Sequence, residues 1–260
     1  MSYNTRLIYL SRYVLVTALV ISSPKSLTMV LGLAPSSQAN QTQTAASADR
    51  DAVLARYFDV YSTGFSIEQR IQQQSQAVGK SAEAIEITKS LESEFQQHVP
   101  SSKLGGVSPL ILSEVANSDL IVMGTPLDAR TLPIEDRSFL FTEYSVRVER
   151  VFSNDRHGIL PGDTIVIARG GGQLTVQGFV VKAVEPAFDE FRLNQRYIFM
   201  LRAIPNSDAY RALGSGTFAV DNEIVSTTSH LEERKSPRRK LDDFLSELDL
   251  AVARKHSRKN

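Results

Sequence analysis

Short apolar runs separated by turn residues dominate the middle of the chain. Between residues 118 and 226 they recur at intervals of roughly 10–20 residues. The segment 140–148 places Tyr144 and Val146 on one face and Glu143 and Arg147 on the other, as a half-buried strand does. The predicted strands are 119–124, 140–148, 164–168, 174–184, 197–202 and 216–220. Short strands without crossover helices between them favour an all-β sandwich or barrel.

Turn residues and glycines punctuate these strands. Pro161 and Gly162 predict a turn before strand 164–168, and Gly170–Gly172 predict a hairpin connection after it. The alternation slips at Arg150–Phe152, which indicates a β-bulge. Gly178 lies inside the run 174–184 and indicates a bend or bulge within a single strand.

Three helical segments are predicted before the strands. The first begins at Asp49, the second has a capping box at Ser66–Gln69, and the third runs from Ser81 to Phe95 and ends before Pro100. Their apolar stripes are narrow and the region is rich in glutamine. Two interpretations therefore stay open: a helical arm for self-association through residues 49–99, or helices that pack loosely on the β domain or are partly disordered.

Two further helices are predicted next to the strands. Ser108 and Pro109 are the residue types preferred at an N-cap and at the first helical position. A final amphipathic helix carries Leu241, Phe244 and Leu248 on one face. The predicted organisation is a signal peptide at 1–39, a helical and partly flexible region at 40–100, a β-barrel domain with a leading short helix at 101–228, and a charged linker with the C-terminal helix at 229–260.

The N-terminus has the features of an export signal. Arg6 and Arg12 precede the apolar run Tyr13–Ile21, and Ser37–Ala39 places small residues at −3 and −1 of a cleavage site. The alternative is an uncleaved membrane anchor, but Pro24–Lys25 interrupts the apolar stretch. We expect an exported protein, located in the periplasm, at the cell surface or outside the cell, with no stable membrane span after cleavage.

The amino-acid composition excludes several kinds of chemistry. The chain has 260 residues, no cysteine and a formal net charge of zero. The missing cysteines exclude disulfides, thiol catalysis and cysteine metal ligands. The balanced charge gives no basic field that would favour specific nucleic-acid binding.

No catalytic or metal-binding constellation stands out in the sequence. The four histidines, His98, His157, His230 and His256, lie far apart, and there is no G-x-S-x-G motif. Adjacent acids occur at Glu135–Asp136, Asp189–Glu190 and Asp242–Asp243, and solvated surface charge is the preferred interpretation. We therefore predict no catalytic residue, no metal and no cofactor.

Two features suggest ligand contacts. Gly170–Gly172 lacks the Gly-Lys-Ser/Thr sequence of a phosphate-binding loop, yet glycines let a ligand approach backbone N–H groups. The predicted ligand-binding residues are Arg169, Gly170, Gly171, Gly172 and Gln173. Phe139 and Phe141 near Arg147 could stack bases or sugars, but packing of both rings beneath a helix is the preferred interpretation.

Five short motifs in a fixed order carry a family resemblance. They are Asn117–Gly124, Tyr144–Val151, Leu160–Asp163, Gly170–Gly172 and Arg196–Leu201. With them the region Ser108–Ser226 resembles uncharacterised exported bacterial β-domain proteins, and is similar in turn to the OB-like barrel of netrin modules and tissue inhibitors of metalloproteinases. The resemblance implies a mainly β fold, an antiparallel OB-like barrel of about five to six strands. Those inhibitors act through an N-terminal cysteine, so their activity is not carried over to this chain.

Three functional hypotheses follow. The first is an exported, non-enzymatic binding or interaction module with an envelope or extracellular partner. The second is a hydrolase acting on glycan or peptide with dispersed carboxylates. The third is a structural accessory protein that forms a homo-oligomer through residues 49–99.

Overall fold

The computed structural model describes residues 38–78, 84–89, 106–155, 158–229 and 238–259. The chain divides into two compact units, Met1–Ala39 and Asn40–Asn260, and both sheets belong to the second. Nearly all of the predicted signal peptide and most of the charged linker lie outside the described residues. Strands account for 46% of the structure and helices for 29%, which confirms the prediction of a mainly β protein.

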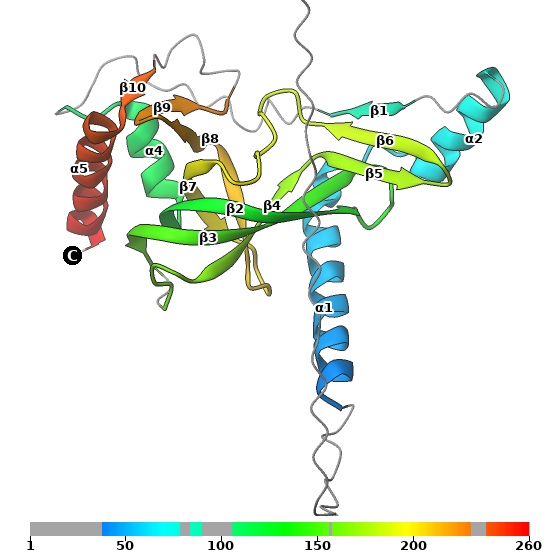
Figure 1. Cartoon of the computed structure of the whole chain (residues 1–260), viewed down its shortest axis with the longest axis horizontal. Helices are drawn as coiled ribbons and strands as arrows, with labels where there is room; N and C mark the ends of the chain where they lie inside the picture. The colour runs from blue at the N-terminus through cyan, green and yellow to red at the C-terminus, as the bar shows by residue number, and fades with distance from the viewer. Residues whose placement is uncertain (1–37, 79–83, 90–105, 156–157, 230–237, 260) are drawn as a thin grey trace, which may run out of the picture. The chain divides into compact units, whose positions relative to one another are not determined.

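Helices and strands follow one another in the order drawn in Figure 1. The helical elements are α1 (Gln38–Tyr57), the 3-10 turn η1 (Phe58–Tyr61), α2 (Ile67–Val78), α4 (Pro109–Asn117) and α5 (Leu241–Lys259). The strands are β1 (Ile85–Thr88), β2 (Leu120–Pro133), β3 (Leu140–Asn154), β4 (Thr164–Gly170), β5 (Gly172–Val176), β6 (Phe179–Val184), β7 (Arg196–Ala203), β8 (Ala209–Asp221), β9 (Ile224–Thr227) and β10 (Arg239–Lys240).

Seven strands form one sheet in the order β10, β9, β8, β4, β3, β2, β7. Its pairings are antiparallel, as predicted, except for the parallel pair β4 and β8. Side-chain alternation carries no information about strand direction, so the sequence could not reveal this exception. β7 pairs with β8 as well as with β2. The register of β2 and β3 shifts next to Val151 and leaves Phe152 unpaired, which confirms the predicted bulge.

A second, three-stranded sheet has the order β1, β6, β5. β5 and β6 form a hairpin whose two-residue turn, Gln177–Gly178, has positive φ angles of 51° and 85° at both positions. Positive φ at both positions is the geometry of a type I′ hairpin turn. Gly178 therefore ends one strand and starts another, and the prediction of a single bent strand at 174–184 is wrong.

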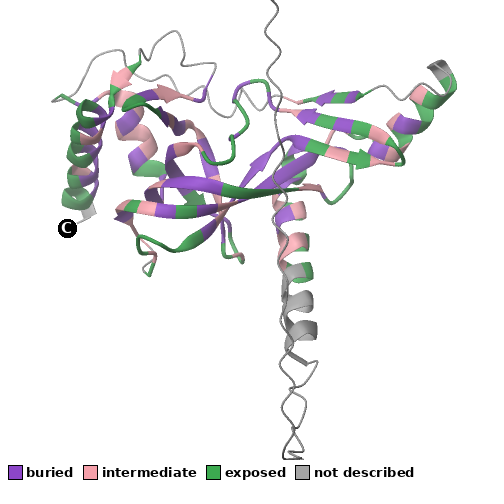
Figure 2. Cartoon of the chain, viewed as in Figure 1, coloured by how far each residue is buried: buried purple, intermediate pink, exposed green. Residues whose placement is uncertain are grey.

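The large sheet buries an apolar cluster and carries a helical layer near its C-terminal strands (Figure 2). This cluster includes Val146, Ile167 and Phe199, each fully buried. α4 and α5 bury Ile111, Phe244 and Leu248 against β7, β8 and β9. α4 begins as predicted, with Ser108 as N-cap and Pro109 at N1, and α5 confirms the predicted C-terminal amphipathic helix.

A third cluster joins the N-terminal helices to both sheets. Leu54 of α1, Phe58 and Tyr61 of η1, and Ile67 of α2 are each no more than 1% exposed. The rings of Phe58 and Tyr61 stack on Phe141 and Phe139 at centroid distances of 5.1 Å. Phe139 and Phe141 thus lie beneath helical residues, as the preferred interpretation has it. These helices are integral parts of the core, so the expectation of loose packing is wrong for the described residues.

β1 replaces the third predicted helix. Ile85 and Ile87 are buried and Glu86 and Thr88 are exposed, so burial alternates with a period of two rather than following one face of a helix. β1 pairs with β6 in parallel, a contact with residues almost a hundred positions later in the chain. That long-range pairing outweighed the local helical spacing. The rest of the predicted helix, at 81–83 and 90–95, lies outside the described residues.

Two boundaries in the β region also differ from the prediction. β2 continues through Pro126 to Pro133, where a polar loop is predicted from Asp128, because β3 pairs with it over that whole length. Gly170–Gly172 joins β4 of the large sheet to β5 of the small one, and β4 and β5 are not paired. The predicted hairpin connection is therefore a crossing between sheets, and β5 finds its antiparallel partner in β6.

Candidate functional site

The five residues predicted to bind a ligand lie where the chain leaves β4 and enters β5. Arg169 is buried, and its guanidinium donates hydrogen bonds to the carbonyl oxygens of Phe188, at 2.6 Å, and Asp189. It also lies over the rings of Phe188 and Phe191, at 5.7 and 5.3 Å from their centroids. Arg169 therefore fixes the loop that follows β6.

The three glycines provide room for packing. A Cβ at Gly170 would come within 2.5 Å of the Tyr61 ring, and one at Gly172 within 2.1 Å of the Thr142 hydroxyl. Gly171 has a φ of 99°; its N–H donates to Leu140 and its carbonyl accepts from Thr142, both at 2.8 Å. Both polar backbone groups of Gly171 are thus engaged within the chain.

Gln173 is the exposed member of the five. It lies opposite Lys182 in the β5–β6 pairing, and Lys182 lies opposite Glu86 of β1. All three side chains are exposed on the outer face of the three-stranded sheet. The structure thus separates the predicted set into four residues that pack inside the chain and one that faces solvent. Ligand binding by the five stays a prediction.

Sequence reasoning missed a buried polar cluster beside Arg169. The Tyr61 hydroxyl donates to Oε2 of Glu185 at 2.7 Å. Burial raises the pKa of Glu185, while the Tyr61 hydrogen bond and the charges of Arg169 and Arg211 act in the opposite direction. Burial and the neighbouring carboxylate also raise the pKa of Tyr61. Glu185 lies 124 positions from Tyr61, so no local pattern connects the two residues.

Arg211 completes this cluster from β8. Burial acts to lower its pKa, but Tyr61, Tyr57 and Glu185 together raise it, so Arg211 stays a cation. The cluster borders a cavity of only about 10 Å³, which is close to the minimum for one water molecule. The lining residues are Tyr61, Arg169, Gly170, Glu185, Phe188, Phe191, Arg211, Ala212, Gly214, Thr217 and Thr228. The cluster joins η1, β4, β8 and the residue that follows β6, and its cavity has no room for a substrate.

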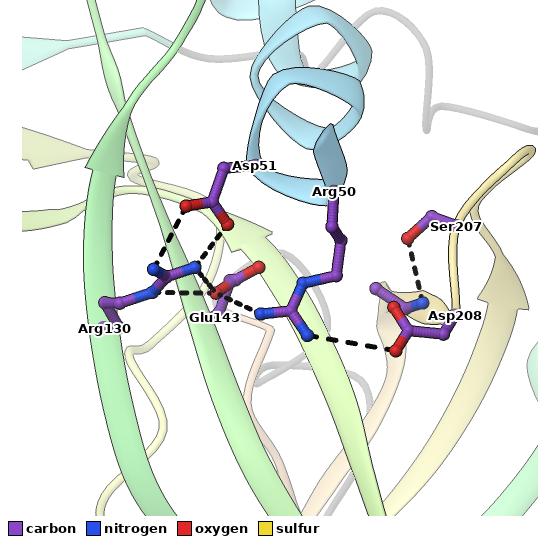
Figure 3. A network of polar contacts seen from close by, with 7 residues as sticks. Arg50, Asp51, Arg130, Glu143, Ser207 and Asp208 are labelled. Atoms are coloured by element: carbon purple, nitrogen blue, oxygen red, sulfur yellow. Dashed lines mark hydrogen bonds and ion pairs between the residues drawn. The ribbon is translucent and has the colours of Figure 1, made fainter. Parts of the chain in front are cut away.

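A second polar network ties α1 to the strands (Figure 3). Arg130 of β2 binds Glu143 of β3 at 2.6 Å and forms two hydrogen bonds with Asp51 of α1, at 2.5 and 3.1 Å. Arg50 of α1 lies 3.5 Å from Glu143 and 3.9 Å from Asp208, just before β8. The hydrogen bond to Asp51 raises the pKa of Arg130.

Glu143 is the centre of this network. Its side chain is 6% exposed, and only Oε2 has partners; Oε1 and the buried Nε of Arg50 have none among the described residues. A buried polar atom without a hydrogen-bond partner costs free energy, so the network is not fully satisfied by the side chains described. The network holds α1 in one position on the sheet.

The predicted acid pairs lie in three different settings. Glu135 forms an ion pair with Arg56 at 3.3 Å, and Asp136 accepts hydrogen bonds from Ser62 and from the N–H of Ser138. The exposed Asp189–Glu190 pair lies in the loop after β6, and Asp242–Asp243 is in the first turn of α5. An acidic first turn stabilises a helix through its dipole.

Side chains that commonly bind metals do not gather in the described part of the chain. Within the described ranges no group of three or more His, Asp or Glu side chains could hold a metal ion. Three of the four histidines lie outside those ranges, and the fourth, His256, is 3.5 Å from the Ser153 hydroxyl. In the same ranges no helix combines the length and apolarity needed to span a bilayer.

Together these observations define a mostly β protein with mainly antiparallel strand pairings, helical layers and two polar networks. Comparison with models of known protein families and with curated protein sequences finds no match.

Proposed function

We propose that the chain is an exported, non-enzymatic binding module built on an OB-like barrel. The observation that carries this proposal is the double pairing of β7, with β2 and with β8. Pairing therefore runs from β2 through β3, β4, β8 and β7 and returns to β2. This order supports a five-stranded Greek-key barrel of the OB type, and the buried apolar cluster supports it further.

The usual binding face of such barrels is occupied in this chain. OB barrels bind ligands on their second and third strands and on the loops that join strands one to two and four to five. The corresponding elements are β3, β4 and the turns 134–139 and 204–208. Phe58 stacks on Phe141 and Tyr61 on Phe139, while Arg50 reaches Asp208. We therefore assign binding to a different surface.

That surface is the outer face of the three-stranded sheet. Glu86, Lys182 and Gln173 form one row across β1, β6 and β5, and the exposed Thr88 and Thr175 flank it. A flat surface of amide, hydroxyl and charged groups suits a polar macromolecular partner of the envelope or the extracellular medium. It also includes Gln173, the solvent-facing member of the predicted ligand-binding set.

Capture experiments test the surface. The chain as purified from its cell, and a Lys182→Ala/Gln173→Ala variant, would each be immobilised and exposed to envelope extract and culture medium. We expect a partner that the unaltered chain retains and the double variant loses, with unchanged thermal unfolding of both. Arg147→Ala, an exposed residue of β3, serves as the control and should retain the partner. Equal capture by the double variant would contradict the assignment.

Export has its own test. Mass measurement of the chain isolated from each cell fraction should find it outside the cytoplasm, beginning after Ala39 when the signal is cleaved. A full-length chain in the cytoplasm with residues 1–39 intact would contradict export.

The alternative function, a hydrolase acting on glycan or peptide, draws support from Glu185. A carboxyl with a raised pKa suits a general acid, and this one lies beside the Tyr61 hydroxyl and two arginines. The cavity of about 10 Å³ would have to open for a substrate. If an activity is found, Glu185→Gln should abolish it while the fold is retained; undiminished activity would exclude this site.

A further inference from the structure

β1 is an edge strand of the three-stranded sheet. Its partner is β6, and no second strand pairs with it among the described residues. The edge strand β10 of the large sheet is different. It consists only of Arg239–Lys240, and a short, cationic edge discourages further pairing. β1 is longer, and its single charge at Glu86 is opposite Lys182 of β6.

The backbone hydrogen bonds between β1 and β6 show which N–H and C=O groups of β1 point away from β6, toward the edge that has no strand partner among the described residues. The N–H of Lys89 donates to the carbonyl of Val184 on β6 at 3.1 Å. Successive residues of a strand direct their N–H and C=O groups to opposite sides. Ile85 and Ile87 therefore bond toward β6, and the N–H and C=O groups of Glu86 and Thr88 point away from it.

We propose that the chain self-associates through this edge, with β1 of two copies pairing in antiparallel fashion around a two-fold axis at Ile87. Glu86 of each copy then lies opposite Thr88 of the other, and each such pair exchanges two backbone hydrogen bonds. The two small sheets become one sheet of six strands. Ile87 meets Ile87 of the second copy on the buried face, which continues the apolar row.

The side chains select this register. Other registers centred on a residue of β1 keep the same hydrogen-bond phase. One is centred on Glu86 and places Glu86 opposite Glu86 of the second copy, where like charges repel. Those centred on Ile85 or Thr88, at the ends of the strand, pair fewer residues of β1 with β1 of the second copy. The register centred on Ile87 replaces that repulsion with two Glu–Thr pairs. The edge of β1 that has no strand partner among the described residues is therefore complementary to itself, and a second copy is the partner that the strand specifies.

The dimer should be weak. Four residues on each side bury less than the roughly 1,000 Å² of a stable protein interface. We therefore expect a concentration-dependent equilibrium between monomer and dimer rather than a permanent dimer. This inference uses the backbone edge of β1, whereas the binding face proposed above is the outer face of the same sheet. Glu86 and Thr88 belong to both, but Lys182 and Gln173 do not lie on the edge, so Lys182→Ala/Gln173→Ala should leave the dimer unchanged.

Charge substitutions at Thr88 provide the test. Sedimentation equilibrium would be measured over a range of concentrations with the chain as purified from its cell. Thr88→Glu places a second acid opposite Glu86 at both symmetric pairs and should weaken the dimer about tenfold, whereas Thr88→Lys places a cation there and should strengthen it by a similar factor. The opposite signs distinguish pairing from loss of fold.

Thr175→Glu is the matched control, because Thr175 is also exposed on the small sheet but lies on β5, away from the β1 edge. It should leave the dimer unchanged. A chain that stays monomeric at all accessible concentrations would overturn the proposal. So would a dimer that responds equally to all three substitutions.

Discussion

Two layers pack on the outside of the large sheet, and they are stabilised by different means. The C-terminal layer, α4 and α5, packs aliphatic side chains and Phe244 against β7, β8 and β9. The N-terminal layer, which consists of α1, η1, α2 and the three-stranded sheet, packs stacked aromatic rings against β3 and β4. Both layers bury side chains completely, so the difference lies in the kind of contact rather than in its extent.

Polar contacts separate the layers further. In the C-terminal layer Lys255 is 6% exposed and bridges Asp155, at 2.8 Å, and the carbonyl of Ser118. In the N-terminal layer Arg130 is 44% exposed and bridges Asp51 and Glu143. The C-terminal ion pair is thus shielded from water, while the N-terminal network lies partly in solvent, where salt screens it.

The largest expected effect compares one buried ring from each layer. Phe58→Ala and Phe244→Ala each remove a side chain that is 1% exposed and in contact with a second ring. Each should lower the free energy of unfolding by about 3–5 kcal/mol, measured by urea denaturation. A loss below about 1 kcal/mol for Phe58→Ala alone would mean that the N-terminal layer is only loosely attached.

The same comparison explains how much the sequence could predict. α5 follows from apolar residues four apart, and α4 from Ser108 and Pro109, because local spacing alone encodes both. The N-terminal layer depends on pairs such as Phe58 with Phe141 and Ile85 with Val181, which are remote in sequence. Single-sequence patterns carry no signal for such pairs.

The candidate site divides along the same line. The glycine run marks a segment that packs closely in the fold. Its contacts, Tyr61 and Thr142, come from elements that lie far from it in the sequence. The buried Glu185 had no motif to mark it, because its partners arrive from η1, β4 and β8. A packing role and a ligand role for Gly170–Gly172 look identical in sequence, since both require small residues.

The second prediction compares the two ionic contacts. Lys255→Ala removes a nearly buried cation together with its ion pair to Asp155 and its hydrogen bond to the Ser118 carbonyl, and should cost about 3–5 kcal/mol. Arg130→Ala leaves Glu143 with Arg50 at 3.5 Å and should cost less, about 1–3 kcal/mol. The loss of unfolding free energy should be measured for both variants at low and at high salt, and it should depend more strongly on salt for Arg130→Ala than for Lys255→Ala. The reverse order of the two losses would show that the N-terminal network is the better shielded one.

The third prediction concerns one helix N-cap in each layer. The Ser108 hydroxyl accepts from the N–H of Ile111, and the Ser66 hydroxyl from the N–H of Gln69, both at 3.3 Å. Alanine at either serine should cost about 1 kcal/mol in thermal or urea unfolding. Gln69 also accepts from the N–H of Ser66 at 2.8 Å, so Ser66→Ala/Gln69→Ala should cost more than Ser66→Ala. Equal losses for the single and double variants would argue against the capping box.

The smallest effect expected is a pH dependence that arises in the N-terminal layer. Burial raises the pKa of Glu185 above its usual value of 4.5, although Tyr61, Arg169 and Arg211 partly offset the shift. A carboxyl with a raised pKa in the folded state contributes stability that is fully present below the pKa of the unfolded chain. That contribution is lost as pH rises through the folded pKa.

Glu185→Gln cannot titrate at this position, so it serves as the reference. The unfolding free energy of the unaltered chain relative to this variant should fall between about pH 4 and the raised folded pKa and then level off. Taking the difference between the two proteins removes the titration of Asp136, whose pKa is lowered by hydrogen bonds from Ser62 and Ser138 that outweigh its burial. A difference that rises with pH over this interval would mean that the two arginines, rather than burial, control the protonation of Glu185.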